Sequence, residues 1–502
     1  MRHRRNKMGE NGEIMDSPLE SEVKPLVKDR NAVVTDDGQV VFKQGGVFRK
    51  GVLEVVVITF YTALMSFFPI VQQYIYNRVL TEEMNRNPVN ASVVTHTDDT
   101  TETCGRNGSS AAEAVAQKQA AQWLLYFGLA TNIPGIFSTM ILGAYTDFRG
   151  RKIGMIVPAI GSLIRTVISM FVIGLDWPMA LFVVGGLIDG TCGSFGTVFM
   201  AAFAYLADTT QPGKERTMRI AILQAAIGIC MSVALMGTGF LIKAAGFFYP
   251  MFLSLGSLLI NVPLVLFLLP ETIQKRNDIR ILDWKRISNA FITYVKPRED
   301  GKRWKLLSLL LALFMVDMVQ IGKAQIDTLF QLGVPFCWDS VKIGIYSAIA
   351  MFLQIFGLLA FLRPLQKFFS DNTIGIIGSV SGTAFLIMTG LSVNDAMLYA
   401  APFIGLLYGV PSAMLKAVMS LYVGKQEQGC LFAGICSIQM LCSTVGSVVF
   451  NAVYMATVTT FAGFVFILMA ILFVICIVCM TVVEIFGRAG KRYESITPVA
   501  GQ

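Results

Sequence analysis

The sequence predicts an all-helical membrane protein with twelve transmembrane helices, arranged as two halves of six helices each. The first reason is composition. Of the 502 residues 54% are hydrophobic and only 15% are charged, and mean hydropathy is +0.61, whereas a soluble chain needs more charge to cover its surface. The second is that apolar runs of about 20 residues, the length that spans a bilayer, occur twelve times. The third is a basic stretch, 271–303, between the sixth and seventh runs.

The apolar runs give the expected positions of the spans. These are 51–78, 119–144, 152–175, 178–207, 217–242, 247–270, 304–332, 342–362, 373–391, 395–422, 429–455 and 461–486. The expected domains are a tail at 1–50, a first six-helix half at 51–270, a linker at 271–303, a second six-helix half at 304–486 and a tail at 487–502. Two helical halves about a central path are typical of secondary transporters.

Lysine and arginine residues indicate the orientation in the membrane. The net charge of +8 comes from residues between the apolar runs and in the tails, so we interpret it as topology rather than as affinity for nucleic acid. Placing the basic linker in the cytosol also places both tails there, and puts 79–118 outside or in an organelle lumen. That loop holds glycosylation sequons at Asn90 and Asn107, which are modified only on that side.

A short motif joins the second and third apolar runs. Residues 143–152 read GAYTDFRGRK, which fits G-x-x-x-D-x-x-G-R-[RK]. Gly143 lets two helices approach closely. Asp147 can form an ion pair or hydrogen bond with the end of a neighbouring helix, and Gly150 permits a tight reversal of the chain. Arg151 and Lys152 suit a cytoplasmic face. An ordinary basic turn is the alternative. The motif resembles the loop between helices 2 and 3 of the major facilitator superfamily of secondary transporters, which implies the major facilitator fold and a cytoplasmic gate.

Further stretches are similar to a narrower family. Residues 332–340, LGVPFCWDS, resemble the loop after helix 7 in the proton-coupled folate transporter family, which includes the thymic stromal cotransporter. Residues 203–208 in helix 4, 221–228 in helix 5 and 427–429 at the start of helix 11 resemble the same family. The resemblance covers about residues 51–486. It implies that the first external loop is N-glycosylated and that its cysteine pairs with one after helix 7.

The cysteine positions allow one disulfide between the halves. Seven of the nine cysteines lie in predicted spans, where buried thiols usually act as small apolar groups. Cys104 and Cys337 lie in external loops, after helix 1 and after helix 7, and could form a disulfide that ties the two halves together. The family resemblance implies the same pair.

Three positions depart from the family pattern. Helix 5 has Gln224 where relatives that couple folate to protons have Glu, and helix 7 has Gln320 where they have His. In helix 10 Lys416 replaces the family's Arg and keeps its charge. Both His residues of the chain lie outside the predicted spans. These departures argue against folate as the substrate, and proton coupling needs a different carboxylate.

Charged residues inside the apolar spans are costly and usually functional. Helix 7 carries Asp317, Lys323 and Asp327. The last two are four residues apart and can meet on one helix face, which leaves a neutralising pair and a transport role open. Asp317 lies nearer the middle and is the best candidate for a proton or substrate group. Lys416 either binds an anionic substrate or neutralises Asp317, and the two roles can alternate.

A second set of charges lies in the first half. Arg165 and Asp189 are at nearly equal distances from the turn between helices 3 and 4. Since these helices run antiparallel, the two side chains should lie at similar depth, and a structural ion pair is favoured over a transport role. Asp208 and Arg219 are assigned, with Asp147, to the cytoplasmic gate.

These observations predict a secondary active transporter that moves a small organic, anionic solute by alternating access, with proton coupling left open. A transport-like receptor that binds ligand without net translocation is the alternative. A membrane enzyme is disfavoured, because the spans hold no His and no metal-ligand cluster, and neither a cofactor nor a metal is expected. The expected partners are the lipid bilayer, the solute and protons, with the chain a monomer or weak homo-oligomer. Sorting patterns at 22–27 and 493–496 leave plasma membrane and endolysosomal membrane equally open.

Overall fold

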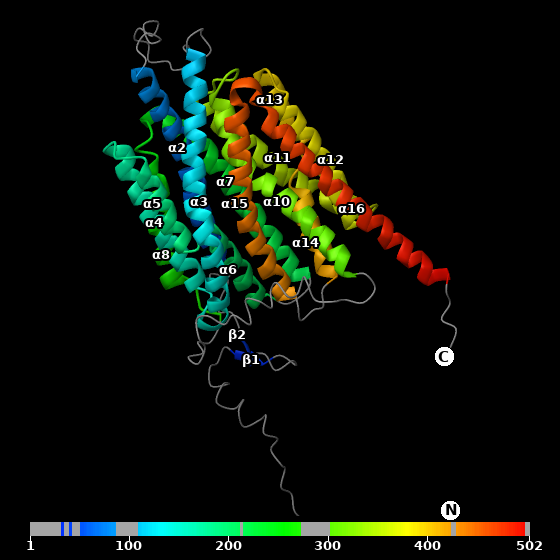
Figure 1. The fold of residues 1–502 in the computed structure, drawn as a ribbon. Coiled ribbons are helices and arrows are strands. Elements are labelled where there is room, and N and C mark those ends of the chain that lie inside the picture. The colour runs from blue at the N-terminus through cyan, green and yellow to red at the C-terminus, as the bar shows by residue number, and fades with distance from the viewer. Residues whose placement is uncertain are drawn as a thin grey trace, which may run out of the picture. The chain divides into compact units, whose positions relative to one another are not determined.

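The computed structural model describes residues 32–34, 40–42, 51–86, 109–210, 214–272, 302–422 and 428–496 (Figure 1). Two short strands, β1 (Ala32–Val34) and β2 (Val40–Phe42), pair antiparallel with Val33 opposite Val41. They belong to a unit formed by Met1–Gly51, which is distinct from the unit Val52–Gln502. The strand pair is an addition to the all-helical prediction. In the second unit, every regular element of the described residues is a helix.

The helices follow the predicted spans in order. Those of the first half are α2 (Val52–Arg86), α3 (Ser109–Arg149), α4 (Ile153–Gly174), α5 (Ala180–Thr191), α6 (Ser194–Thr209), α7 (Lys214–Ala245), α8 (Met251–Pro263) and the π-helical turn η4 (Leu264–Leu268). Those of the second half are α10 (Lys302–Leu332), α11 (Ser340–Gln366), α12 (Asp371–Gly390), α13 (Asp395–Ile404), α14 (Val410–Leu421), α15 (Gln428–Phe461) and α16 (Phe464–Ile496).

The described residues contain eleven helices that are long and apolar enough to cross a membrane. The remaining predicted span, the tenth in the chain at 395–422, is present as the two shorter helices α13 and α14. Twelve spans therefore fit the structure, and the predicted fold class is confirmed. Some predicted spans were shorter than the helices, since α2 and α3 continue into the polar residues that flank their apolar cores.

Two of the predicted spans are broken in the middle. In the first half, Gly193 separates α5 from α6 and has a φ of 97°, a conformation that glycine adopts without steric cost. In the second half, residues 405–409 form turns between α13 and α14. Pro411 stands in the first turn of α14, where its missing N–H removes no helical hydrogen bond. Hydropathy alone does not reveal such breaks, because both sides of each break are apolar.

Two pairs of helices make the main contacts between the halves. Helix α7 packs against α11, and α3 packs against α15, as Figure 1 shows for the second pair. We call the end of the bundle that carries residues 150–152 the inner end, and the opposite end, with residues 239 and 344, the outer end. The Tyr454 hydroxyl and Gln117 Oε1 lie 3.3 Å apart across the halves. These contacts fix the relative position of the halves near the outer end.

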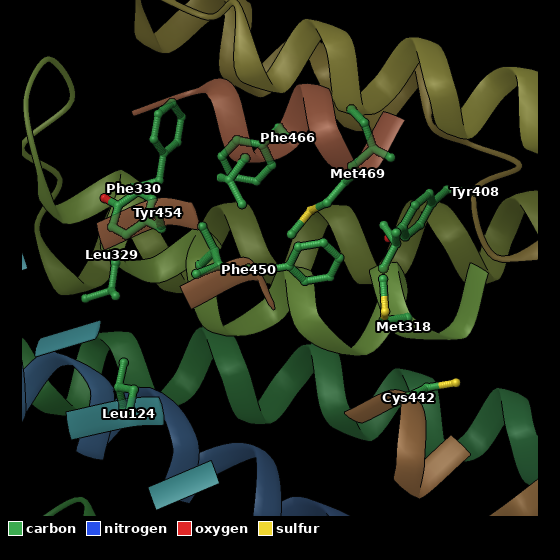
Figure 2. Close-up of a cluster of buried hydrophobic side chains, with 14 of the residues drawn as sticks. Leu124, Met318, Leu329, Phe330, Tyr408, Cys442, Phe450, Tyr454, Phe466 and Met469 are labelled. Atoms are coloured by element: carbon green, nitrogen blue, oxygen red, sulfur yellow. The ribbon is translucent and has the colours of Figure 1, made fainter. Parts of the chain in front are cut away.

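The second half has an apolar core between α10, α15 and α16 (Figure 2). Its aromatic side chains include Phe330 and Phe466, whose ring centroids are 5.0 Å apart. Phe450 and Tyr454 of α15 are fully buried in the same cluster. Close packing of this kind makes α10 a rigid support for the polar residues that it carries.

Candidate functional site

Asp317 lies on α10 at the centre of a polar cluster. Its side chain is 2% exposed, and both carboxylate oxygens accept hydrogen bonds from neutral groups. Ser412 of α14 donates its hydroxyl to Oδ1 at 2.6 Å, and Gln439 of α15 donates Nε2 to Oδ2 at 3.0 Å. Lys416 of α14 places Nζ 3.7 Å from Oδ2, an ion-pair distance that is longer than a hydrogen bond.

The sequence left open whether Lys416 binds an anionic substrate or neutralises Asp317, and the structure places the two side chains at ion-pair distance. Their exposures differ: the Lys416 side chain is 26% exposed, while that of Asp317 is 2% exposed. A partly exposed ammonium group can reach a solute without moving the carboxylate. Because Asp317 has two neutral donors, it keeps hydrogen-bond partners when Lys416 turns away. The cluster therefore combines one accessible cation with one enclosed carboxylate.

Ser412 and Gln439 were missed by the sequence analysis. Neutral polar residues are common in spans, and their type alone does not show which of them face a charge. Ser412 stands four residues before Lys416, so both lie on one face of α14. This spacing is a signal that was available in the sequence. No comparable signal identifies Gln439.

The two glutamines that replace family residues have different surroundings. Gln320 is one helical turn from Asp317 and donates Nε2 to the backbone oxygen of Tyr408 at 2.8 Å. This carbonyl belongs to the turn between α13 and α14, so Gln320 satisfies a group that the helix break leaves without a helical partner. Gln224 lies on α7 with an exposed side chain, and no described contact brings it to Asp317.

Lys323 and Asp327 form an ion pair on α10, as their spacing predicted. Lys323 is 6% exposed, and its ammonium group lies 4.6 Å from the ring centroid of Phe385 on α12 and 5.7 Å from that of Phe466 on α16. The pair is thus directed into the second half, among α10, α12 and α16. These contacts favour the neutralising role over contact with a solute.

Arg165 and Asp189 form an ion pair of 2.8 Å in the first half, and neither side chain is more than 1% exposed. Ser162 and Ser194 donate hydroxyls to the Asp189 carboxylate at 2.6 and 2.9 Å. The guanidinium group also lies 4.1 Å from the ring centroid of Phe67. The predicted pairing is present, and its enclosure agrees with a structural role.

The motif between the second and third spans forms the turn at the inner end. Gly150 has a φ of 118°, so the expected reversal occurs at the residue that allows it. Gly143 lies against Met200 of α6, with the thioether sulfur 2.9 Å from where a Cβ would stand. Lys152 donates Nζ to the backbone oxygen of Leu266 at 3.2 Å. Asp147 belongs to α3, and its side chain lies outside what the structure describes.

Arg151 connects this turn to two other segments. Its Nε lies 2.9 Å from Asp208 Oδ2 at the end of α6, and its backbone N–H donates to Glu271 Oε1 at 2.7 Å. The backbone N–H of Thr272 donates to the same oxygen at 3.1 Å, and its hydroxyl lies 3.3 Å from Asp208. Glu271, which the sequence analysis did not identify, thereby joins the start of the linker to the motif.

Arg219 was assigned to the same set as Asp208. The structure pairs it with Glu54 on α2, with Nη1 2.7 Å from Oε1. It therefore joins α7 to α2 near the inner end, inside the first half. Glu54 lies in the first turn of α2, where a charged residue is unremarkable, and this explains why its role was not foreseen.

The outer end carries an ion pair between the halves. Lys243 of α7 places Nζ 3.1 Å from Asp339 Oδ2, and Asp339 also caps α11 by accepting the backbone N–H of Lys342 at 3.0 Å. Cys337, two residues earlier, is not one of the free cysteines of the described chain, which are Cys192, Cys230, Cys442, Cys476 and Cys479. Cys104, Asn90 and Asn107 lie outside the described residues.

Comparison with known proteins places these features in a family. The Major Facilitator Superfamily profile matches residues 51–447. The chain is 28% identical over 438 residues to the proton-coupled folate transporter of Rattus norvegicus, covering 87% of this chain and 93% of that protein. It is 30% identical over 437 residues to the lysosomal proton-coupled steroid conjugate and bile acid symporter of Homo sapiens, covering 85% and 92%.

Solved structures agree on the fold. The human organic anion transporter TETRAN superposes with a TM-score of 0.60 at 15% identity, covering 86% of this chain and 99% of that one. A POT family transporter in complex with 5-aminolevulinic acid gives 0.58 at 13% identity, covering 88% and 97%. The family profile and the curated relatives show that the chain is a multi-pass membrane protein and a secondary transporter. It belongs to the major facilitator superfamily and, within it, to the family of the proton-coupled folate transporter.

Proposed function

We propose that this transporter moves an organic anion together with protons, with Lys416 as the anion-binding group and Asp317 as the proton-binding group. The observation that carries the proposal is the 3.7 Å ion pair in which Asp317 is enclosed and hydrogen-bonded while Lys416 is partly exposed. Intramembrane charges of this kind are usually functional. The named substrates of the relatives support the class: folate is an organic anion, and so are bile acids and many steroid conjugates.

The two groups would work in alternation. With no solute bound, Lys416 stays near Asp317 and favours the ionised carboxylate. An anionic solute draws Lys416 away, and the carboxylate then holds a proton more readily. Solute and proton thus enter the same conformation together, and alternating access carries both across the membrane.

Transport by purified protein in proteoliposomes tests this function. The probes are a radiolabelled steroid sulfate, a bile acid and folate, each measured with and without a pH gradient. We expect uptake of at least one anion to rise with the gradient, Lys416→Ala to weaken its binding and Lys416→Arg to keep part of it. Asp317→Asn should remove the pH dependence and leave exchange of bound substrate working. A full pH profile in Asp317→Asn would contradict the assignment.

The same assay separates the receptor alternative. A receptor would bind one of the probes at equilibrium and show no counterflow of labelled probe into liposomes loaded with the unlabelled compound. Counterflow in the wild-type protein would exclude it.

The remaining parts of the proposal concern topology and gating. We propose that 271–303 and both tails face the cytosol, that Asn90 and Asn107 carry glycans and that Cys104 pairs with Cys337. The charge distribution and the two sequons in one loop support this arrangement. We also propose that the inner-end contacts of Arg151 act in gating, because they join the turn after α3 to the end of α6 and to the start of the linker.

A further inference from the structure

Two consecutive residues of α15 join the Asp317 cluster to the opposite half. Gln439 donates Nε2 to Asp317 within the second half. Met440 is 2% exposed and is seated against Gly196 of α6 in the first half. A Cβ at Gly196 would overlap the Met440 methyl group and lie 3.1 Å from its sulfur. The hydrogen bond on the carboxylate is therefore one residue away from a contact between the halves.

Gln439 contacts α10 through its side-chain bond to Asp317, whereas neighbouring residues of α15 contact the α10 backbone. Further toward the outer end, Cys442 donates its thiol to the backbone oxygen of Phe314 at 3.5 Å. A Cβ at Gly446 would stand 2.8 Å from the backbone oxygen of Met318, so the two backbones are in direct contact there. The bond from Gln439 to Asp317 joins two side chains, whereas the contacts of Cys442 and Gly446 are made with the backbone of α10. Its amide can leave Asp317 without disturbing the close backbone packing.

Several titratable groups lie around Asp317, and the binding of a proton to its carboxylate would depend on them. The titratable groups that face it are Lys416 of α14, Tyr408 in the turn before α14, Cys442 of α15 and Cys476 of α16. Helices α2 and α3 also pack against α10, and in the described part neither joins a charged side chain to Asp317 by a hydrogen bond or ion pair. Removing the Gln439 amide would thus change a donor to Asp317 without changing any charge.

We propose that Gln439 is a positioning residue that links proton binding at Asp317 to the arrangement of the two halves. When the contact between Met440 and Gly196 opens, this turn of α15 is released and the amide leaves the carboxylate. An ionised carboxylate that loses a donor is less stable, so Asp317 takes a proton from water. When the contact forms again, the amide returns and the proton goes back to water. This inference rests on the proposed function, which supplies the proton coupling.

The first test uses Gln439→Met, which keeps the size of the side chain and removes the donor. In proteoliposomes, the pH midpoint of uptake of the steroid sulfate should rise by about one to two pH units, the equivalent of one hydrogen bond to a charged group. Infrared difference spectra of the purified protein without solute should show the protonated carboxyl signal that Asp317→Asn removes, also displaced to higher pH. Gln439→Leu provides a second variant if the first does not fold.

Gln325→Met is the matched control. Gln325 also lies between α10 and α15, where its Oε1 accepts from Ser447 at 3.0 Å and from Asn451 at 3.1 Å. This variant removes an amide from the same pair of helices without touching Asp317. It should leave the pH midpoint of uptake and the pH midpoint of the infrared carboxyl signal unchanged, even if it lowers thermal stability. Equal displacement in the two variants would overturn the proposal, because a general loosening of the helices would then explain both.

The second test examines the link to the other half. Met440→Ala removes the contact with Gly196 and should raise the midpoint in the wild-type background. In the Gln439→Met background it should have no further effect, since the two changes act through the same hydrogen bond. If the shifts in pH midpoint from the two substitutions add, the link between the Met440 contact and the Gln439 hydrogen bond is overturned. An unchanged pH midpoint in Gln439→Met would overturn the role of Gln439. If no probe is transported but the infrared signal moves as expected, the proposed function fails and this inference stands.

Discussion

Gly239 of α7 and Gly344 of α11 face each other across the two halves, at the outer end. A Cβ built on Gly239 would stand 3.2 Å from the Cα of Gly344, and one built on Gly344 would stand 2.9 Å from the backbone oxygen of Leu235. No side chain separates the two helices at this point. Glycine pairs of this kind let membrane helices approach to backbone contact.

The first prediction follows from this contact. Gly239→Leu should force α7 and α11 apart and lower the free energy of unfolding by about 1–3 kcal/mol, the usual cost of overpacking. Gly237→Ala is the matched control, because a Cβ there meets nothing within 4 Å and alanine favours a helix. Thermal unfolding of the purified proteins would measure both. Equal melting temperatures for Gly239→Leu and the wild type would show that the halves do not need this contact.

The second prediction concerns the ion pair in the first half. Asp189→Asn removes the negative charge and leaves the Arg165 guanidinium group buried without its counter-ion. A broken buried pair costs about 3–5 kcal/mol, so the variant should unfold at clearly lower temperature or fail to accumulate. The double variant Arg165→Met, Asp189→Asn should recover part of the loss, because it removes the unpaired charge. Wild-type stability in the single variant would contradict the structural role.

The third prediction concerns the inner-end turn. Arg151→Ala removes the ion pair with Asp208 and should slow net transport about fivefold, the rate equivalent of one charged contact worth about 1 kcal/mol. Equilibrium binding of the anion should stay nearly unchanged, because Lys416 lies elsewhere in the bundle. Arg149→Ala removes a neighbouring positive charge and serves as the control. A large loss of affinity with normal turnover would assign Arg151 to substrate binding instead.

The fourth prediction is that Asn90 and Asn107 carry glycans. Both sequons lie in the loop that the charge distribution places outside. Glycosidase treatment should increase the gel mobility of the wild-type protein, and Asn90→Gln and Asn107→Gln should each remove part of that change. If neither substitution alters mobility, the proposed orientation loses its support.

The fifth prediction is a disulfide between Cys104 and Cys337. Peptide mapping without reduction should recover the two linked peptides. Cys104→Ser or Cys337→Ser should lower the free energy of unfolding by about 2–4 kcal/mol. The substitutions should alter affinity for the anion much less than stability, because both residues lie outside the predicted spans. Recovery of both residues as free thiols would exclude the bond.

The sequence predicted the ion pair of the first half, because each of its two charges would be costly alone inside the membrane. Arg165 and Asp189 were matched because two charges in adjacent antiparallel spans have few other ways to be neutralised. For Lys416 the sequence left two roles open, binding of an anionic substrate and neutralisation of Asp317. Hydropathy likewise predicted where the chain crosses the membrane, because a bilayer requires long apolar runs in any fold.

Neutral partners and helix ends could not be predicted in this way. Gln439 costs little in a span and carries no periodic signal, so its bond to Asp317 becomes visible only when α15 is packed on α10. Glu271 lies at a polar boundary, where a carboxylate is ordinary. Its contact with the backbone of Arg151 depends on the fold returning residue 271 to the turn at 151.

The break between α13 and α14 divides one membrane crossing into a part bonded at the outer end and a part that carries two residues of the Asp317 cluster. Asp395, at the start of α13, accepts the indole N–H of Trp338 at 2.8 Å and pairs with Lys342 at 3.3 Å. Helix α14 carries Ser412 and Lys416 and follows a turn in which the Tyr408 oxygen accepts from Gln320 and the Leu407 N–H donates to Ser381. A tilt of α14 alone would withdraw Lys416 from Asp317 and leave the anchoring of α13 intact. Such a tilt would change the charges around a solute and leave the outer-end contacts of the same membrane crossing in place.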